Sequence, residues 1–125
     1  MWNLLLVMLG GAIGAGARYA VGRASLAALG PGYPWGTLMV NLAGGLAMGL
    51  LAAWLARGAS GGEPVRLLLG VGVLGGFTTF SAFSLEIVTM MERGDWIAAL
   101  AYALLSVVGA VAALMAGLAV GRVLA

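Results

Sequence analysis

The stretch Gly75-Gly76-Phe77-Thr78-Thr79-Phe80-Ser81-Ala82-Phe83-Ser84 brings hydroxyl and aromatic side chains into the middle of an apolar segment, about 65–91. Paired glycines weaken a helix, and a backbone carbonyl that is freed in hydrocarbon needs a new partner. A helix break at membrane depth persists only where it is buried in protein or borders a water-filled path or an ion site. We therefore expect a membrane-spanning helix that is broken near its centre, and we expect the break to be the functional centre.

Several neutral side chains elsewhere in the chain could act together with this break. Amides and hydroxyls can donate hydrogen bonds to an anion, and an aromatic ring has an electropositive edge. A narrow track of such groups suits a small, strongly hydrated anion, whereas pores for larger anions carry arginine or lysine rings. A packing role between helices is the alternative for the amide and for the polar residues of the last span. The candidate pore residues are Asn41, Thr79, Phe80, Ser81, Phe83, Tyr102 and Ser106.

Tyr102 and Ser106 are separated by four residues, so they share one face of a helix, and Ala110 ends that polar stripe. A cation path would need carboxylates, and Glu86 is the one carboxylate within an apolar segment. Glu86 could carry protons, or it could form a structural hydrogen bond or pair with an arginine such as Arg18. We favour the structural role, because Glu86 lies about two turns from the end of its helix.

Arg18 and the backbone of the break allow further interpretations. Arg18 could extend to the membrane interface, give a positive field at a pore mouth, or tie helix ends together. Carbonyls freed at Gly75 and Thr78 are hard oxygen donors, and two copies of the chain would bring four of them together. Such a set could hold a dehydrated Na⁺ as a structural ion. In the alternative, neighbouring helices simply cap these carbonyls.

The composition fixes the class of protein. The chain has 125 residues, of which 63% are hydrophobic and 8% charged, whereas soluble domains carry about 25% charged residues. We expect a single-domain integral membrane protein. It has no cysteine and no histidine, which excludes disulfides, thiolate or imidazole metal sites and histidine-dependent catalysis. An enzyme is not expected, and the scattered arginines give no basic stripe for nucleic acid.

The predicted fold is all-α, with four transmembrane helices. Paired glycines at spacings of four predict close helix packing in three of them, at Gly10/Gly14, Gly45/Gly49 and Gly117/Gly121. Residues 22–35 are expected to form a loop, since they include strong turn residues. The predicted spans are about 3–21, 36–56, 65–91 and 96–121.

Four spans place both termini on one side, together with Arg57, Arg66 and Arg122. The other side carries Arg18, Arg23 and Arg93, so the arginines are balanced at three against three. Because a lysine or arginine bias sets membrane orientation, a chain without one can insert both ways. The two orientations could then pair as an antiparallel homodimer with two-fold symmetry.

The chain resembles the CrcB/Fluc fluoride channels. Three segments carry the resemblance, and the third is highly specific. Together with the length and the four spans, the likeness covers the whole chain. The segments are Gly10-Gly11-Ala12-Ile13-Gly14-Ala15 through Arg18-Tyr19, Gly36-Thr37-Leu38-Met39-Val40-Asn41, and the run Gly75 to Ser84.

This resemblance implies a dual-topology antiparallel homodimer in a prokaryotic plasma (inner) membrane, with two pores that conduct fluoride passively out of the cytoplasm. It implies that Asn41, Phe80 and Phe83 line the path, and that Tyr102 and Ser106 form a polar track. Carbonyls matching Gly75 and Thr78 would hold a central Na⁺, and Arg18 would lie near the vestibule. Ala110 and Ala82 depart from the family pattern, which often has hydroxyl residues there.

Two other functions fit parts of the pattern. A small dual-topology proton-coupled multidrug antiporter would need a membrane-embedded carboxylate, and Glu86 is the available one. A non-conducting packing subunit would use the glycine and alanine ridges, but it would give no reason for the polar break.

Overall fold

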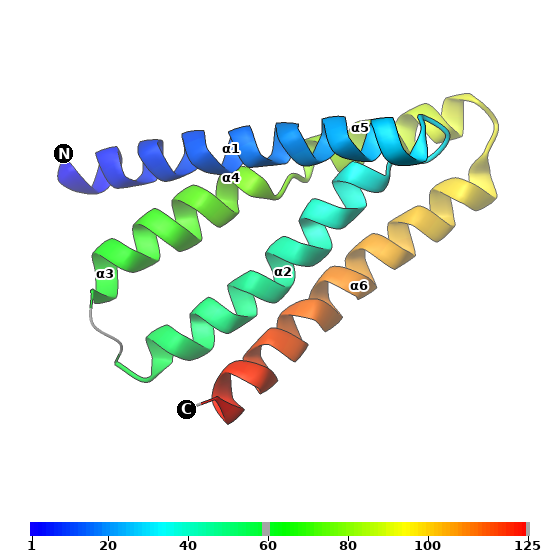
Figure 1. Cartoon of the computed structure of the whole chain (residues 1–125). Coiled ribbons are helices and arrows are strands. Elements are labelled where there is room, and N and C mark those ends of the chain that lie inside the picture. The colour runs from blue at the N-terminus through cyan, green and yellow to red at the C-terminus, as the bar shows by residue number, and fades with distance from the viewer. Residues whose placement is uncertain (59–60, 125) are drawn as a thin grey trace.

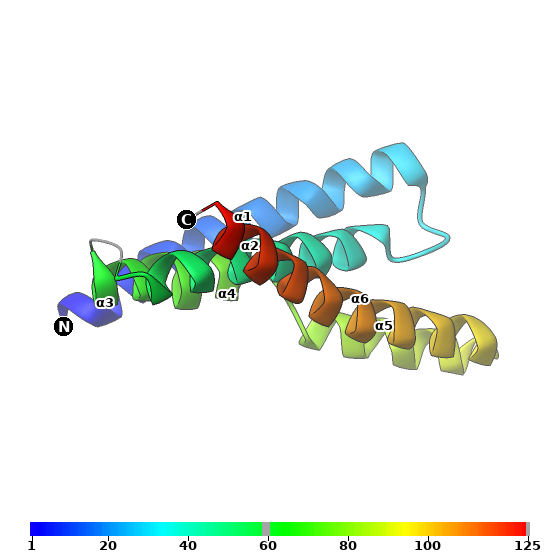
Figure 2. The same cartoon turned by 90° about the horizontal axis from the view of Figure 1, so that it is seen from below.

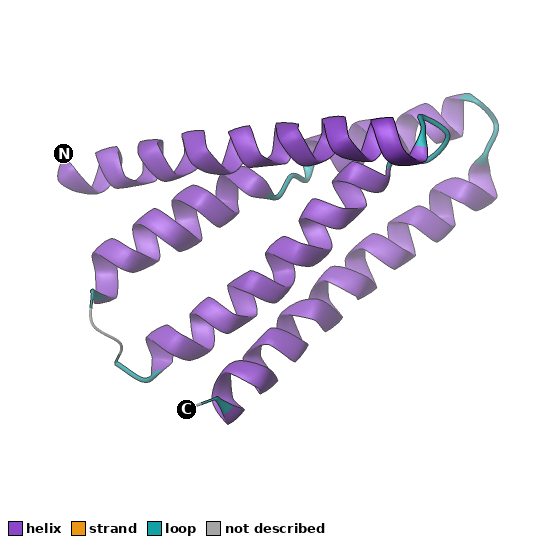
Figure 3. Ribbon diagram, in the orientation of Figure 1, coloured by secondary structure: helices purple, strands orange, loops and turns teal. Residues whose placement is uncertain are grey.

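The computed structural model describes residues 1–58 and 61–124. Within this part of the chain every regular element is a helix (Figure 3). The elements are, in order, α1 (Trp2–Leu29), α2 (Trp35–Ala56), α3 (Gly62–Val65), the π-helix η1 (Arg66–Leu74), α4 (Gly75–Phe77), α5 (Ser81–Glu92) and α6 (Trp96–Val123) (Figure 1).

The helices form four apolar stretches, because α3, η1, α4 and α5 follow one another closely. The stretches are Trp2–Leu29, Trp35–Ala56, Gly62–Glu92 and Trp96–Val123, and each is long and apolar enough to cross a membrane. Successive stretches run in opposite directions, so both termini lie at the end opposite to the α1–α2 and α5–α6 connections (Figure 1).

Most of the apolar surface of these helices faces outward. At most 33% of the residues in the most hydrophobic part of any stretch are buried within the chain, and the value is 11% for α6. Large apolar side chains such as Leu104, Val108 and Met115 are exposed. A surface of this kind is stable against lipid hydrocarbon or against another apolar protein surface, and not against water.

The first helix is longer than the sequence analysis predicted. Residues 22–29 were expected to belong to a loop, but α1 continues to Leu29. Alanine and leucine dominate this segment and favour helix. The helix ends only at Gly30, whose φ of 78° is accessible to glycine and whose N–H donates to the Leu26 carbonyl (2.9 Å). The loop therefore shortens to residues 30–34.

Glycines allow α1 to touch the third stretch backbone to backbone. Gly10 and Gly14 are buried, and a Cβ on Gly14 would overlap the Val73 carbonyl oxygen. Gly76 of α4 meets the backbone of Gly11 in the same way. The predicted packing role of Gly10 and Gly14 is confirmed, and their partner is the segment that leads into α4.

The same arrangement joins α2 to α6. A Cβ on Gly49 would overlap the Leu114 carbonyl oxygen, and one on Gly117 would overlap the carbonyl oxygen of Leu46. A Cβ on Gly45 would lie 2.8 Å from the carbonyl oxygen of Ala110. These contacts confirm that the paired glycines of both helices pack helix against helix.

Gly14→Ala should destabilise the protein by about 1–3 kcal/mol, because the added methyl group must push α1 away from the Val73 backbone. Gly16→Ala is the matched control, since a Cβ there meets nothing within 4 Å. It should be neutral or stabilising by up to about 1 kcal/mol through helix propensity. Thermal unfolding in detergent measures both changes, and equal midpoints for the two variants would contradict the packing role of Gly14.

The third stretch is unusual before the break as well as at it. The π-helix η1 spans 9 residues, whereas π-winding usually occurs as a single turn inside an α-helix. Its buried residues are Gly70 and Gly72, and the N–H of Gly75 donates back to the Gly70 carbonyl. Beyond the break, α5 packs beside the first part of α6, away from the loop end of α1 (Figure 2).

The buried core lies beside the break, where α2, α5 and α6 meet. It consists of Leu38, Phe83, Met90, Ala99 and Tyr102. Tyr102 is the largest side chain in it, with 0% exposure. The core thus fixes two of the candidate pore residues, Phe83 and Tyr102, relative to one another.

Candidate functional site

The chain leaves helical geometry over residues 78–80, between α4 and α5. Thr78 has extended backbone angles (φ −85°, ψ 158°). Its N–H (3.0 Å) and its hydroxyl (2.9 Å) both donate to the Leu74 carbonyl, which closes the end of α4. The backbone groups of the next residues must then find partners outside this helix.

Asn41 of α2 supplies two of these partners. The Thr79 N–H donates to Oδ1 of Asn41 (2.8 Å), and Nδ2 of Asn41 donates to the Thr79 carbonyl (3.0 Å). An amide has two N–H donors, so one N–H of Asn41 is left after the bond to Thr79. Asn41 therefore makes a tertiary contact of the kind considered as its alternative role, and its target is the non-helical backbone of the break.

Arg18 supplies a third partner. Its Nε donates to the Gly76 carbonyl (3.1 Å), on the last turn before the break. Because α1 continues to Leu29, Arg18 lies well inside the helix and not near its end. The contact ties the interior of α1 to α4, so it involves one helix end and not the two considered for Arg18.

Side-chain hydroxyl groups form hydrogen bonds with the backbone at the beginning of α5. The Ala82 N–H donates to Oγ1 of Thr79 (3.2 Å), and the Thr79 and Ser81 hydroxyls lie 3.3 Å apart. The hydroxyl of Ser84 donates to the Phe80 carbonyl (2.9 Å). These hydroxyls hold the geometry of the break, a role that the sequence analysis did not separate from ion binding.

Two carbonyls of the break have lost their helical donors. The Thr79 N–H, which would bond Gly75 in a continuous helix, donates to Asn41 instead. The Ala82 N–H, which would bond Thr78, donates to the Thr79 hydroxyl. Within the described ranges, no hydrogen bond reaches the carbonyl oxygens of Gly75 or Thr78.

A cavity of about 430 Å³ lies against the break, between α2, α5 and α6. It brings together many of the predicted pore residues, whereas Ser81 and Tyr102 lie outside its lining. The side chains at its wall are neutral, and those that are not polar are small, aliphatic or aromatic, with one methionine. The predicted residues that line it are Asn41, Thr79, Phe80, Phe83 and Ser106, together with Thr78.

Ser106 is the polar group at this wall that lacks a partner. Its side chain is 5% exposed, and its Oγ makes no hydrogen bond to any described residue. A buried hydroxyl without a partner is unfavourable, so Ser106 is the unsatisfied polar group of this region. One turn further along α6 the wall continues with Ala110, where the polar stripe ends.

The two phenylalanines of the cavity differ in exposure. Phe83 is 7% exposed within the chain, whereas Phe80 is 74% exposed. Their ring centroids lie 5.4 Å apart, and the Phe83 ring lies 5.3 Å from the Tyr102 ring. Phe80 therefore forms an edge of the cavity that the chain itself does not cover.

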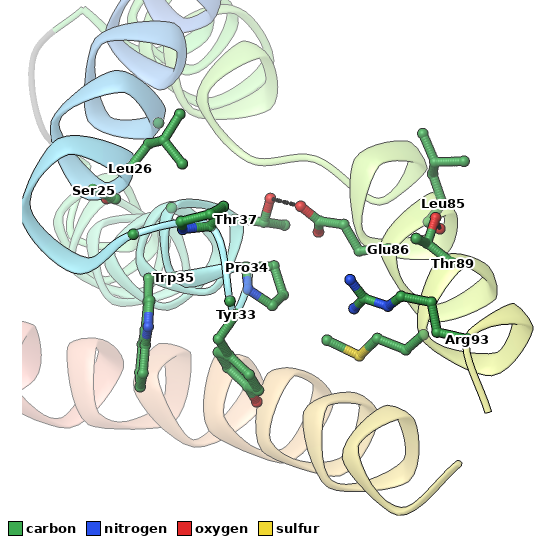
Figure 4. Close-up of a pocket in the computed structure, with 16 residues that line it drawn as sticks. Ser25, Leu26, Tyr33, Pro34, Trp35, Thr37, Leu85, Glu86, Thr89 and Arg93 are labelled. Atoms are coloured by element: carbon green, nitrogen blue, oxygen red, sulfur yellow. Dashed lines mark hydrogen bonds between the residues drawn. The ribbon is translucent and has the colours of Figure 1, made fainter. Parts of the chain in front are cut away.

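Glu86 lies in a second cavity of about 390 Å³, between the α1–α2 loop and α5 (Figure 4). Its Oε2 accepts a hydrogen bond from the Thr37 hydroxyl (2.9 Å), and its Oε1 accepts one from the Tyr102 hydroxyl (2.8 Å). The structural hydrogen bond expected for Glu86 is thus observed. The pairing with Arg18 considered as an alternative is not, because Arg18 bonds Gly76.

Sequence reasoning missed Thr37 and Tyr33 as parts of this region. Thr37 lies one turn before Asn41 on α2, so a search for polar residues at a spacing of four would have found it. Tyr33 lies in the segment that was predicted as a loop, and no spacing rule connects it to Tyr102, whose ring centroid lies 5.5 Å from its own.

Four apolar helices that are long enough to cross a membrane define a multi-pass membrane protein, and a neutral cavity lies against the break in its third stretch. Residues 5–118 match the family described as CrcB-like protein, Camphor Resistance (CrcB), and the chain belongs to this family.

Curated relatives cover nearly the whole chain. A protein of Sphingopyxis alaskensis is 58% identical over 118 residues, which are 94% of each chain. One from Chelativorans sp. is 57% identical over 122 residues, 98% of each chain. One from Phenylobacterium zucineum is 59% identical over 123 residues, 98% of this chain and 97% of its own. Each is named a fluoride-specific ion channel, FluC. The resemblance noted in the sequence is confirmed, as is the expectation of an ion-channel family and not an enzyme.

Proposed function

We propose that this protein is a fluoride-selective channel that lets fluoride leave the cytoplasm passively and so relieves fluoride toxicity. The names of the relatives support fluoride as the ion. The observation that carries the proposal is the neutral cavity, which Asn41, Phe83 and Ser106 line together. Neutral donors can replace part of the hydration of a small anion without holding it too tightly for release.

Anion efflux from liposomes tests this function. Vesicles that contain the purified protein are loaded with fluoride or with chloride, a K⁺ ionophore is added, and an ion-selective electrode records release. We expect rapid fluoride release and negligible chloride release. No release of either ion from folded protein would contradict the channel and would favour the proton-coupled antiporter, in which Glu86 would be the residue to replace.

We further propose that two copies assemble as an antiparallel homodimer with two pores in the prokaryotic inner membrane. Phe80 supports a second copy, because its ring is 74% exposed beside the cavity and would be covered by one. The balanced arginines of the sequence favour insertion in both orientations. A reporter fused to the C-terminus should give signal on both sides of the membrane, and signal on one side alone would contradict dual topology.

We also propose a structural Na⁺ at the dimer interface. The carbonyls of Gly75 and Thr78 fit this role, because both have lost their helical donors and are hard oxygen ligands. Two copies of the chain would contribute four such oxygens. When bound, Na⁺ would supply positive charge that replaces the missing N–H partners and would hold the two breaks together.

Na⁺ should therefore raise the thermal unfolding midpoint of the purified dimer in detergent. At a Na⁺ concentration about 100 times its Kd, the expected stabilisation is about 2.7 kcal/mol. K⁺ and N-methyl-D-glucamine at the same ionic strength serve as controls, because the effect must be specific to a small ion. Identical midpoints in all three salts over a wide concentration range would contradict the Na⁺ site without bearing on fluoride conduction.

A further inference from the structure

A continuous series of aromatic contacts joins the loop after α1 to the break. Ring centroids are separated by 4.8 Å for Trp35 and Tyr33, 5.5 Å for Tyr33 and Tyr102, 5.3 Å for Tyr102 and Phe83, and 5.4 Å for Phe83 and Phe80. The series begins at the cavity that contains Glu86 and ends at the cavity that contains Ser106. It thus crosses the wall between the two cavities.

Tyr102 is the central member of this series, and its position is fixed by three contacts. Its hydroxyl donates to Glu86 (2.8 Å), and its ring touches Phe83 at an interplanar angle of 52°. On another side it meets Tyr33 in an edge-to-face contact at 82°. The first two partners lie on α5, and Tyr33 is the one that comes from a loop.

The loop holds Tyr33 firmly enough to act as a support. Residues 30–34 are the whole connection between α1 and α2, and they include Pro31 and Pro34, whose φ angles are restricted. The Trp35 N–H donates to the Tyr33 carbonyl (2.8 Å), and the Tyr33 side chain extends toward α6 (Figure 4). Tyr33 is partly buried.

We propose that Tyr33 is a positioning residue for conduction, which acts through the Tyr102 ring to hold Phe83 at the wall of the anion cavity. The proposal rests on the proposed channel function. Without Tyr33, the Tyr102 ring loses its support on the loop side, and the hydroxyl bond to Glu86 and the Phe83 contact are free to shift together. The chemistry required of Tyr33 is therefore that of an aromatic ring, not of a hydroxyl.

Two observations separate the ring of Tyr33 from its hydroxyl. Among the described residues, the Tyr33 hydroxyl forms no hydrogen bond. Burial raises the pKa of the Tyr33 phenol, so the group stays uncharged at neutral pH. Phenylalanine at this position would keep the edge-to-face contact and would change neither charge nor hydrogen bonding.

The test is the fluoride efflux assay with the full chain in liposomes. Tyr33→Leu should lower the efflux rate at least about five-fold, the size expected for the loss of one aromatic pair. Tyr33→Met, which fills the same space with a flexible side chain, should show the same loss if the leucine variant does not fold. Tyr33→Phe should conduct at the wild-type rate. Trp2→Leu is the control, because Trp2 is an exposed aromatic residue at the start of α1 and takes no part in the aromatic series.

A double variant distinguishes positioning from general destabilisation. If Tyr33 acts through the Tyr102 ring, Tyr33→Leu should cause no further loss in a Tyr102→Leu background. Wild-type efflux from Tyr33→Met, a loss in Tyr33→Phe, or additive losses in the double variant would each overturn the proposal. Wild-type protein is measured in parallel. If wild-type vesicles release no fluoride, the proposed channel function has failed, and the three outcomes above do not apply.

Discussion

Replacing Asn41 with aspartate should stop fluoride efflux almost completely. The new carboxylate would face the cavity and repel an anion by about 4 kcal/mol at a separation of 4 Å and an effective dielectric constant of about 20. This energy corresponds to roughly a 1,000-fold loss of rate. Aspartate also lacks the N–H that Asn41 donates to the Thr79 carbonyl. The initial rate of fluoride release from liposomes, at matched protein content, measures the effect.

Asn3→Asp is the matched control for this charge. Asn3 is the other asparagine of the chain and lies exposed in the first turn of α1. The control adds the same negative charge far from the break, so it should leave efflux within about two-fold of wild type. Undiminished efflux from Asn41→Asp would mean that Asn41 lies outside the ion path and serves only to bond Thr79.

Phe83→Ile should reduce fluoride efflux by about 10- to 100-fold, with little loss of folding. Isoleucine retains most of the volume of the buried side chain, which limits the cost in stability to about 1.5 kcal/mol. Isoleucine has no electropositive ring edge to contact the anion. A contact between a charged group and a donor contributes about 1.5–3 kcal/mol. Phe80→Ile should show a similar loss, because Phe80 lines the same cavity. The measurement combines efflux rates with the elution volume of the purified protein.

Phe77→Ile provides the comparison within the same residue type. Phe77 lies on α4 next to the break, but its side chain does not line the cavity. The Phe77 variant is therefore expected to conduct at a rate near that of wild type even if its unfolding midpoint falls. Equal rates for all three variants would remove the ring-edge interaction from the mechanism.

The parts of the fold that depend on composition and spacing could be predicted from the sequence. Four apolar stretches separated by turn residues give four helices, and the spacing of Gly10 and Gly14 gives close contact with a neighbouring backbone. The candidate set around the break was also accessible, since Asn41 and Ser106 lie with Phe83 around one cavity. Hydroxyls and amides within apolar segments are rare enough to attract attention.

The contacts that could not be predicted are those between segments distant in the chain. The pattern did not show that Arg18 would bond Gly76, 58 residues away, or that the carboxylate of Glu86 would accept hydrogen bonds from two helices. The end of α1 was misplaced because the strong turn residues within 22–35 were taken to mark the whole segment as a loop, whereas α1 continues to Leu29. Helix termini and hydrogen-bond partners are set by packing, which spacing rules do not contain.

Both termini lie at the end opposite to the α1–α2 and α5–α6 connections, and this limits how two copies can be joined into one polypeptide. A short polar linker cannot recross the hydrocarbon, so a tandem gene fusion would hold both halves in the same orientation. An antiparallel pair in a single chain requires an odd number of crossings between the halves, most simply one extra apolar helix of about 20 residues. A polar linker would thus force the two halves of such a chain to be parallel, and an apolar helical linker would force them to be antiparallel.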